Sequence, residues 1–169
     1  MQQKFIFQIA VALFFVLSGC NDNNNQKKSG AKKALEFDTI QLKDLNGKTI
    51  SPDIYSGKTI FINFWATWCK PCLQEMPSIE KAQELLKDKN IEFLFASDET
   101  TEQIEKFKTD HDYGFNYVTG ENIDALNIAG LPTTFIFNPK GKLVFSEMGY
   151  HRWDSKENID LLLEIIRSK

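Results

Sequence analysis

The stretch that decides the fold is FWATWCKPC, residues 64–72. A mostly apolar run at residues 59–65 leads into it, which is typical of a strand buried on both faces of a sheet. Pro71 suits the first turn of a helix, and apolar residues then recur at helical spacing over residues 72–89. A second apolar run at residues 91–96 completes a strand–helix–strand unit, with two cysteines at the C-terminal end of the first strand.

Cys69 and Cys72 are separated by two residues at the expected start of the helix. Two thiols at this spacing lie close enough to form a disulfide, and the unpaired helix N–H groups favour the first sulfur as a thiolate. We therefore expect Cys69 to be the nucleophile that forms a mixed disulfide with a partner. Cys72, one turn deeper, is expected to resolve it, so the pattern predicts a redox pair.

Two other interpretations of the pair remain open. A zinc site requires four ligands, and outside the pair the chain offers only Cys20, His111 and His151 as further cysteines or histidines. A purely structural disulfide would add little stability, because the loop that it closes is so short. Both histidines stand among polar residues and are predicted to lie on the surface.

Two neighbours of the cysteines have two possible roles each. Lys70 either places a positive charge beside the Cys69 thiolate or is simply a solvated residue. Trp68 either shapes the rim of the site, where a partner would bind, or packs as an ordinary apolar side chain.

With these motifs in place, the chain resembles the membrane-tethered TlpA/ResA-like thiol-disulfide oxidoreductases. The matching motifs are FWATWCKPC at 64–72, EMP at 75–77 and GLPTTF at 130–135, and the resemblance spans residues 35–168. It implies a thioredoxin-like α/β fold, in which a central mixed β-sheet is flanked by helices. It also implies an N-terminal β-hairpin and an extra helix inserted in the middle of the domain.

The resemblance assigns roles to further positions. Pro132 should follow a cis peptide bond beside the cysteines, with an ordinary trans proline as the alternative, and the backbone of Leu131 should pair with a substrate peptide. Thioredoxins proper carry a titrating aspartate where this chain has Asn63, and an amide cannot titrate. Glu75, one turn beyond Cys72, is therefore expected to be the acid/base group, or else a solvated helix residue. Asn63 is expected to satisfy buried backbone groups.

The N-terminal segment resembles a bacterial lipoprotein signal. An apolar run at residues 5–17 is followed by Leu-Ser-Gly and then Cys20. This run is shorter than the about 20 residues that a membrane-spanning helix needs, although an uncleaved anchor remains the alternative. We expect residues 1–19 to be a signal peptide and residues 20–34 to be a disordered tether that carries lipid on Cys20. Residues 35–169 are expected to form the thioredoxin-like domain.

The remaining sequence predicts the other elements of that domain. They are a hairpin with strands at 36–42 and 48–50, a helix at 100–111, a strand at 117–118, a short helix at 122–128, a hairpin with strands at 133–138 and 143–148, and a closing helix at 153–166.

Composition narrows the classes of function. The formal net charge of −3 gives no basic footprint for nucleic acid, and no glycine-rich phosphate loop or flavin motif is present, so no cofactor is expected. The resemblance implies a protein disulfide reductase on the outer face of a bacterial membrane. Its partners would be disulfide-bearing exported proteins, such as apocytochrome c, and a membrane thiol-disulfide electron donor.

Three other functions stay open. The same residues could catalyse the reverse reaction and oxidise exported proteins, because the direction of electron flow depends on relative reduction potentials. A peroxidase would need a Pro-x-x-x-Thr-x-x-Cys run, which the chain lacks around Thr67 and Cys69. A redox-silent module that only holds peptides is the third alternative.

Overall fold

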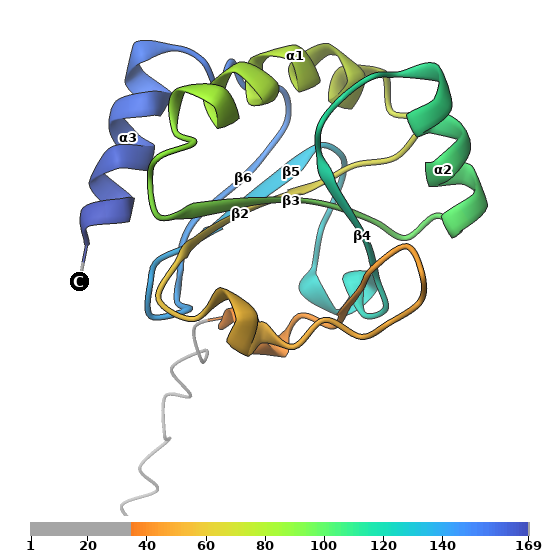
Figure 1. Cartoon of the computed structure of the whole chain (residues 1–169), viewed down its shortest axis with the longest axis horizontal. Coiled ribbons are helices and arrows are strands. Elements are labelled where there is room, and N and C mark those ends of the chain that lie inside the picture. The colour runs from red at the N-terminus through yellow and green to blue at the C-terminus, as the bar shows by residue number, and fades with distance from the viewer. Residues whose placement is uncertain (1–34, 169) are drawn as a thin grey trace, which may run out of the picture. The chain divides into compact units, whose positions relative to one another are not determined.

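The computed structural model describes residues 35–168, and these form a mixed six-stranded sheet with helices packed on it (Figure 1). The predictions for residues 1–19, for the tether at 20–34 and for Cys20 lie outside the described residues. Within the described part, no helix combines the length and the apolar character needed to cross a membrane.

The sheet places one fully buried strand at its centre. The strands are β1 (Leu42–Lys43), β2 (Thr59–Phe64), β3 (Ile91–Ser97), β4 (Asn116–Gly120), β5 (Thr133–Phe137) and β6 (Leu143–Met148). Their order is β1-β4-β3-β2-β5-β6; the β2–β3 and β3–β4 pairs are parallel and the other pairs antiparallel. All six residues of β2 are buried, as its apolar sequence predicted.

Three α-helices and three short 3-10 helices complete the domain. They are α1 (Lys70–Leu85), α2 (Thr101–Asp110), α3 (Lys156–Arg167), η1 (Phe37–Thr39), η2 (Pro52–Tyr55) and η3 (Ile123–Leu126). The capping box predicted at the start of α2 is present, because the Thr100 side chain accepts from Gln103 and the Gln103 side chain accepts in return from Thr100.

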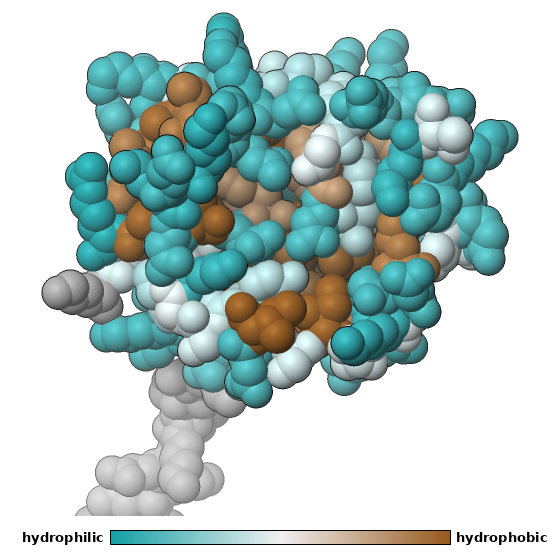
Figure 2. All heavy atoms as spheres, viewed as in Figure 1, coloured by the Kyte–Doolittle hydropathy of each residue, from teal (hydrophilic) through white to brown (hydrophobic). Residues whose placement is uncertain are grey.

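Alternating residues of β2 contribute to two separate cores, one on each face of the sheet. Phe61 packs with buried residues of α1, α2 and α3. Ile60, Ile62 and Phe64 pack instead with the segment that contains η1 and η2. Figure 1 shows the same arrangement, with the α-helices on one side of the sheet and the 3-10 helices on the other. In Figure 2 hydrophilic residues cover most of the visible face.

The predicted N-terminal hairpin is present around Asn46 and Gly47, but its first strand is much shorter than expected. η1 occupies the start of the expected first strand, so only the short β1 remains, and it pairs with β4. Residues 48–50 return beside β1 as predicted: Lys43 and Thr49 form an antiparallel bridge, and the N–H groups of Asp44 and Ile50 donate to the carbonyls of Lys48 and Leu42. The Thr39 hydroxyl donates a hydrogen bond to the Glu36 carbonyl at 2.6 Å, which favours the turn. The ring of Phe37 packs edge-on against Phe137 at a centroid distance of 5.5 Å. The 3-10 turn η1 thus buries Phe37 where the first strand was expected to begin.

The other predicted elements are present, with shifted ends. α1 begins at Lys70 and ends at Leu85 instead of covering 72–89, and the predicted short helix at 122–128 is the 3-10 turn η3. α3 begins at Lys156 because the Ser155 side chain accepts from the N–H of Asn158 and so caps the helix there.

Candidate active site

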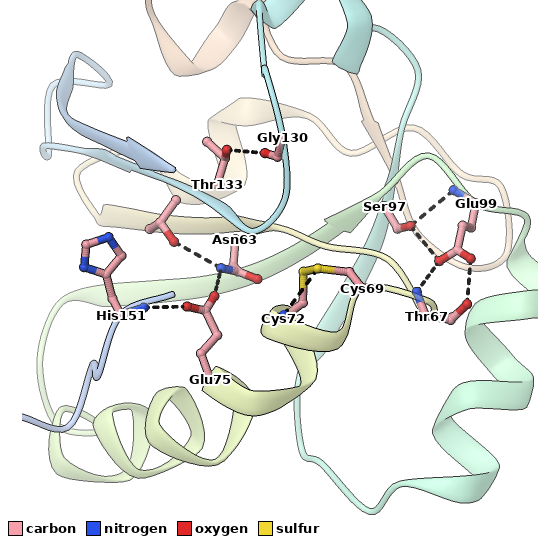
Figure 3. Close-up of a disulfide and its surroundings, with 11 residues drawn as sticks. Asn63, Thr67, Cys69, Cys72, Glu75, Ser97, Glu99, Gly130, Thr133 and His151 are labelled. Carbon is pink, nitrogen blue, oxygen red and sulfur yellow. Dashed lines mark hydrogen bonds between the residues drawn. A yellow bond between two sulfur atoms is a disulfide. The ribbon is translucent and has the colours of Figure 1, made fainter. Parts of the chain in front are cut away.

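The two cysteines form a disulfide where β2 ends and α1 begins (Figure 3). Cys69 is the N-cap of α1, and its sulfur accepts from the backbone N–H of Cys72 at 3.3 Å. Cys69 keeps 4% of its surface exposed, whereas Cys72 has 0%. Of the two cysteines, Cys69 is therefore the more exposed, and it lies at the position where helix N–H groups stabilise negative charge on sulfur.

Glu75 lies fully buried on the same helix and is not a solvated residue. Its Oε1 accepts from Nδ2 of Asn63 at 2.7 Å, and its Oε2 accepts from the backbone N–H of His151 at 3.0 Å. Burial raises the pKa of Glu75 to about 7, because desolvation of the carboxylate outweighs the stabilisation by these hydrogen bonds. A carboxyl group with this pKa, one helical turn from Cys72, can exchange a proton near neutral pH.

Asn63 contacts side chains, so the expectation that it satisfies backbone groups was wrong. Its Nδ2 donates both to Glu75 and to the Thr134 hydroxyl, at 3.0 Å, and its Oδ1 has no hydrogen-bond partner in the described part of the chain. The reason lies in the strand period: Asn63 shares with Phe61 the face of β2 that α1 covers. Because Thr134 follows Pro132 by two residues, Asn63 joins the buried acid to the proline segment.

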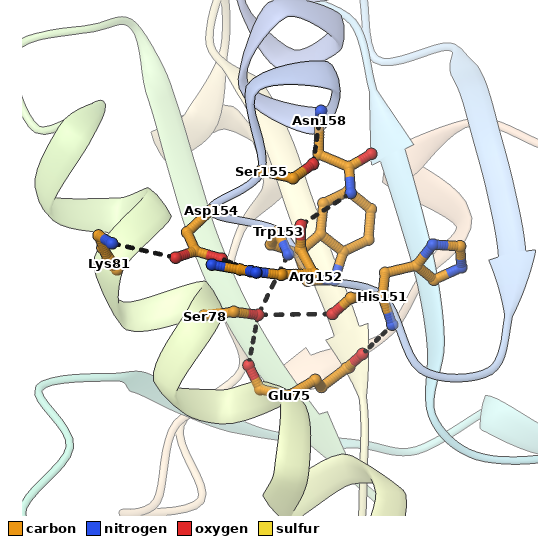
Figure 4. A network of polar contacts seen from close by, with 9 residues as sticks. All are labelled: Glu75, Ser78, Lys81, His151, Arg152, Trp153, Asp154, Ser155 and Asn158. Carbon is orange, nitrogen blue, oxygen red and sulfur yellow. Dashed lines mark hydrogen bonds and ion pairs between the residues drawn. The ribbon is translucent and has the colours of Figure 1, made fainter.

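A second set of polar contacts ties α1 to the segment that precedes α3 (Figure 4). The Ser78 hydroxyl donates to the carbonyl of Glu75 at 2.8 Å and accepts from the N–H of Trp153 at 3.1 Å. Lys81 and Asp154 form an ion pair across the same junction at 3.2 Å. The indole N–H of Trp153 lies near the Glu75 carboxylate but does not have normal hydrogen-bond geometry. The two hydrogen-bond donors to this carboxylate are therefore Asn63 and the backbone N–H of His151.

His151, predicted to lie on the surface, is partly buried. Its side chain is only 23% exposed, its ring packs at 5.3 Å from that of Trp153, and its Nε2 lies 3.2 Å from a carboxylate oxygen of Glu147. Its contribution to the site is the backbone N–H that reaches Glu75, which no side-chain pattern reveals. His111 is exposed, as predicted.

The proline segment and Trp68 lie at the same edge of the sheet as the disulfide. The Leu131–Pro132 peptide bond is cis, as the resemblance implied. Thr133 pairs with Phe64, which brings the start of β5 beside the end of β2. Trp68 is 73% exposed, and it lines a pocket of about 230 Å³ together with Leu131.

Sequence reasoning missed Glu99, which holds the loop that carries Trp68 (Figure 3). One carboxylate oxygen accepts from the backbone N–H of Thr67 at 2.6 Å, and the other accepts from the Thr67 hydroxyl at 2.7 Å. Glu99 follows β3, whose C-terminal end meets that of β2 at this edge of the parallel pair. Only that topological position could have pointed to it.

The zinc interpretation needs further ligands near the cysteines. Within residues 35–168, no three His, Cys, Asp or Glu side chains gather in a way that could hold a metal ion.

Lys70 is exposed at the first position of α1.

Comparisons with known proteins agree with this geometry. The sequence profile of the AhpC/TSA family matches residues 32–146. The thioredoxin-like protein YneN of Bacillus subtilis is 34% identical over 149 residues, covering 83% of this chain and 87% of that protein. The thiol-disulfide oxidoreductase ResA of Bacillus thuringiensis subsp. konkukian is 36% identical over 153 residues, covering 85% of this chain and 87% of ResA.

Solved structures share the fold. A Chlorobium tepidum protein assigned as the thiol:disulfide interchange protein DsbE superposes with a TM-score of 0.68 at 21% identity, covering 79% of this chain and 97% of that protein. A thiol:disulfide interchange protein from Bacteroides sp. gives a TM-score of 0.64 at 23% identity, covering 76% of this chain and 86% of that protein. At these identities the likeness establishes the thioredoxin-like fold alone.

Proposed function

Because this chain belongs to the AhpC/TSA family and is a thiol-disulfide oxidoreductase of the ResA type, we propose that it reduces protein disulfides on the outer side of a bacterial membrane. The observation that carries the proposal is the pairing of a redox disulfide at a helix N-terminus with a buried carboxyl group on the same helix. That combination supplies both the nucleophile and a proton carrier.

In the proposed reaction, the Cys69 thiolate attacks one sulfur of a client disulfide. A Cys69–client disulfide forms, and the other client sulfur leaves as a thiolate that takes up a proton. The Glu75 carboxylate then takes the proton of Cys72, and the Cys72 sulfur attacks the Cys69 sulfur. This closes the Cys69–Cys72 disulfide, and the second client sulfur leaves and takes up that proton from Glu75. Two electrons pass to the client in each cycle; one of its two protons comes from Cys72 through Glu75 and the other from solvent, which received the proton lost by Cys69.

Three residues are proposed to hold the client chain during this exchange. The backbone of Leu131, before the cis Pro132, would pair with the extended client, and Trp68 would form the opposite rim. Support comes from their common position at the edge of the sheet where the disulfide lies.

Membrane attachment is proposed from the sequence. Residues 1–19 have the pattern of a lipoprotein signal, and lipid on Cys20 would anchor the tether at 20–34 to the membrane. Residues 35–169 would then work as the redox domain on the bacterial cell envelope, where protein disulfides persist. Disulfide-bearing exported proteins, apocytochrome c among them, would be the clients, and a membrane thiol-disulfide donor would regenerate the dithiol.

The reduction potential of the Cys69–Cys72 pair against glutathione tests the direction of electron flow. A reductase is expected near or below about −270 mV, and a value towards about −120 mV would instead establish an oxidase. Insulin turbidity provides the activity readout: reduction of insulin by the dithiol form supports the proposal, and insulin left intact contradicts it.

Two further measurements separate the remaining alternatives. The Cys72→Ser variant should trap covalent adducts between Cys69 and client proteins, and their absence from an envelope extract would favour a redox-silent binding module. Turnover of hydrogen peroxide is expected to be negligible, because the peroxidase motif is missing around Cys69.

A further inference from the structure

The pocket lined by Trp68, the residue before Cys69, combines apolar walls with acidic residues. Its apolar lining includes Trp68, Ile128 and Leu131, and two acidic residues, Asp98 and Asp124, also line it. Its volume of about 230 Å³ is below the roughly 300 to 1,000 Å³ typical of sites for whole small-molecule ligands. The pocket therefore suits one side chain of a bound polypeptide.

The two carboxylates are free to receive a partner. Asp98 follows β3 and Asp124 lies in η3, so segments far apart in the sequence place both charges on one pocket. Both residues are exposed, and neither forms an ion pair or a side-chain hydrogen bond with another residue of the described range 35–168. No Lys or Arg lines the pocket. Its charge is thus complementary to a cation.

We propose that this pocket selects client polypeptides that carry a Lys or Arg side chain next to the reacting cysteine. The inference rests on the proposed reductase function and adds a substrate class to it. Because Trp68 lines the pocket and immediately precedes Cys69, we expect a residue next to a client cysteine bound at Cys69 to reach this pocket.

A basic side chain fits both features of the pocket. Its aliphatic stem covers the apolar surface of Ile128 and Leu131, while its charged end lies near Asp98 and Asp124. The exposed ring of Trp68 offers a cation a second favourable contact, since indole is the strongest cation–π partner among the side chains. An acidic side chain would be repelled by the same two carboxylates.

The test uses short peptides that differ at one position. Each peptide carries one cysteine as a mixed disulfide with thionitrobenzoate, flanked on a chosen side by Lys, Gln or Glu, and both sides are tried. The dithiol protein reacts with each peptide at low salt, and the release of the coloured thiol gives the rate constant. Each rate constant is divided by that for dithiothreitol, which corrects for the peptide's own reactivity. We expect the Lys peptide to react about fivefold faster than the Gln peptide, and the Glu peptide to be the slowest.

Charge-reversed variants identify the residues responsible. In the variant that combines Asp98→Lys and Asp124→Lys, the Glu peptide should become the fastest to react. Misfolding cannot produce such a gain in the rate for one peptide. Combined Asp88→Asn and Asp112→Asn changes remove two exposed carboxylates near the opposite ends of the parallel strands and should keep the preference for Lys. The preference should also shrink in 1 M salt, where charges are screened within about 3 Å.

The measured rates distinguish the selection of basic clients from the reductase function itself. Equal corrected rates for the three peptides, or a preference for Lys that survives the charge reversal, would overturn the selection of basic clients while leaving the reductase function intact. Failure of the dithiol protein to react with any peptide would refute the proposed reductase function instead.

Discussion

Replacing the buried acid with its amide, Glu75→Gln, should abolish one component of the pH dependence of stability. The pKa of Glu75 is about 7 in the folded protein, whereas the ordinary value for a glutamate, which applies to the unfolded chain, is 4.5. Below pH 4.5 the carboxyl group is protonated in both states, so the stability that the raised pKa contributes is fully present. As the pH rises towards 7, the unfolded chain releases a proton that the folded protein retains, and this stability is progressively lost.

The size of the effect follows from the two pKa values. A difference of about 2.5 pKa units corresponds to roughly 3 kcal/mol of unfolding free energy across the whole window, and to about 2.5 kcal/mol between pH 5 and pH 8. The substitution also leaves either Asn63 or the N–H of His151 without its acceptor, which costs about 1 to 3 kcal/mol at every pH. The quantity that tests the raised pKa is therefore the difference in unfolding free energy between wild type and Glu75→Gln, compared at the two pH values.

Urea denaturation of the oxidised protein at pH 5 and pH 8 measures this quantity. Wild-type stability minus that of Glu75→Gln should fall by about 2.5 kcal/mol from the lower to the higher pH. Glu80→Gln is the matched control, because Glu80 is exposed on the same helix, and its difference from wild type should stay nearly constant. If the difference for Glu75→Gln is also independent of pH, the reasoning from burial to a raised pKa is refuted.

Three further predictions concern the residues around the site. Asn63→Ala removes a hydrogen bond that lowers the pKa of Glu75, so NMR titration of that carboxyl group should give a midpoint above that of wild type; an unchanged midpoint would contradict the role of Asn63. Glu99→Ala should reduce the unfolding free energy by about 1 kcal/mol and slow insulin reduction, and adding Thr67→Val should cost little more, because their interaction is already lost; additive losses would argue against it. Cys20→Ala should move the protein from the membrane fraction to the soluble fraction, and continued membrane association would count against the lipid anchor.

Much of the fold could be predicted from the sequence because local patterns decide it. The apolar run that becomes β2 and the helical spacing along α1 determine those elements, and Thr100 with Gln103 determines the start of α2. The first strand of the N-terminal hairpin is shorter than the predicted 36–42, because η1 occupies residues 37–39 and packs Phe37 against Phe137, a hundred positions away. No local period reports such a contact.

The sequence by itself determined the chemistry: two cysteines with this spacing at the start of a helix make a redox pair, since the helix backbone that stabilises a thiolate is built locally. Only the tertiary structure decided what surrounds that pair. The register of β2 against β5 places Asn63 beside Thr134, and the packing of α1 on β2 buries Glu75 against Asn63. A carboxyl group acquires a raised pKa only when the folded protein removes it from water, and that removal depends on contacts between distant segments.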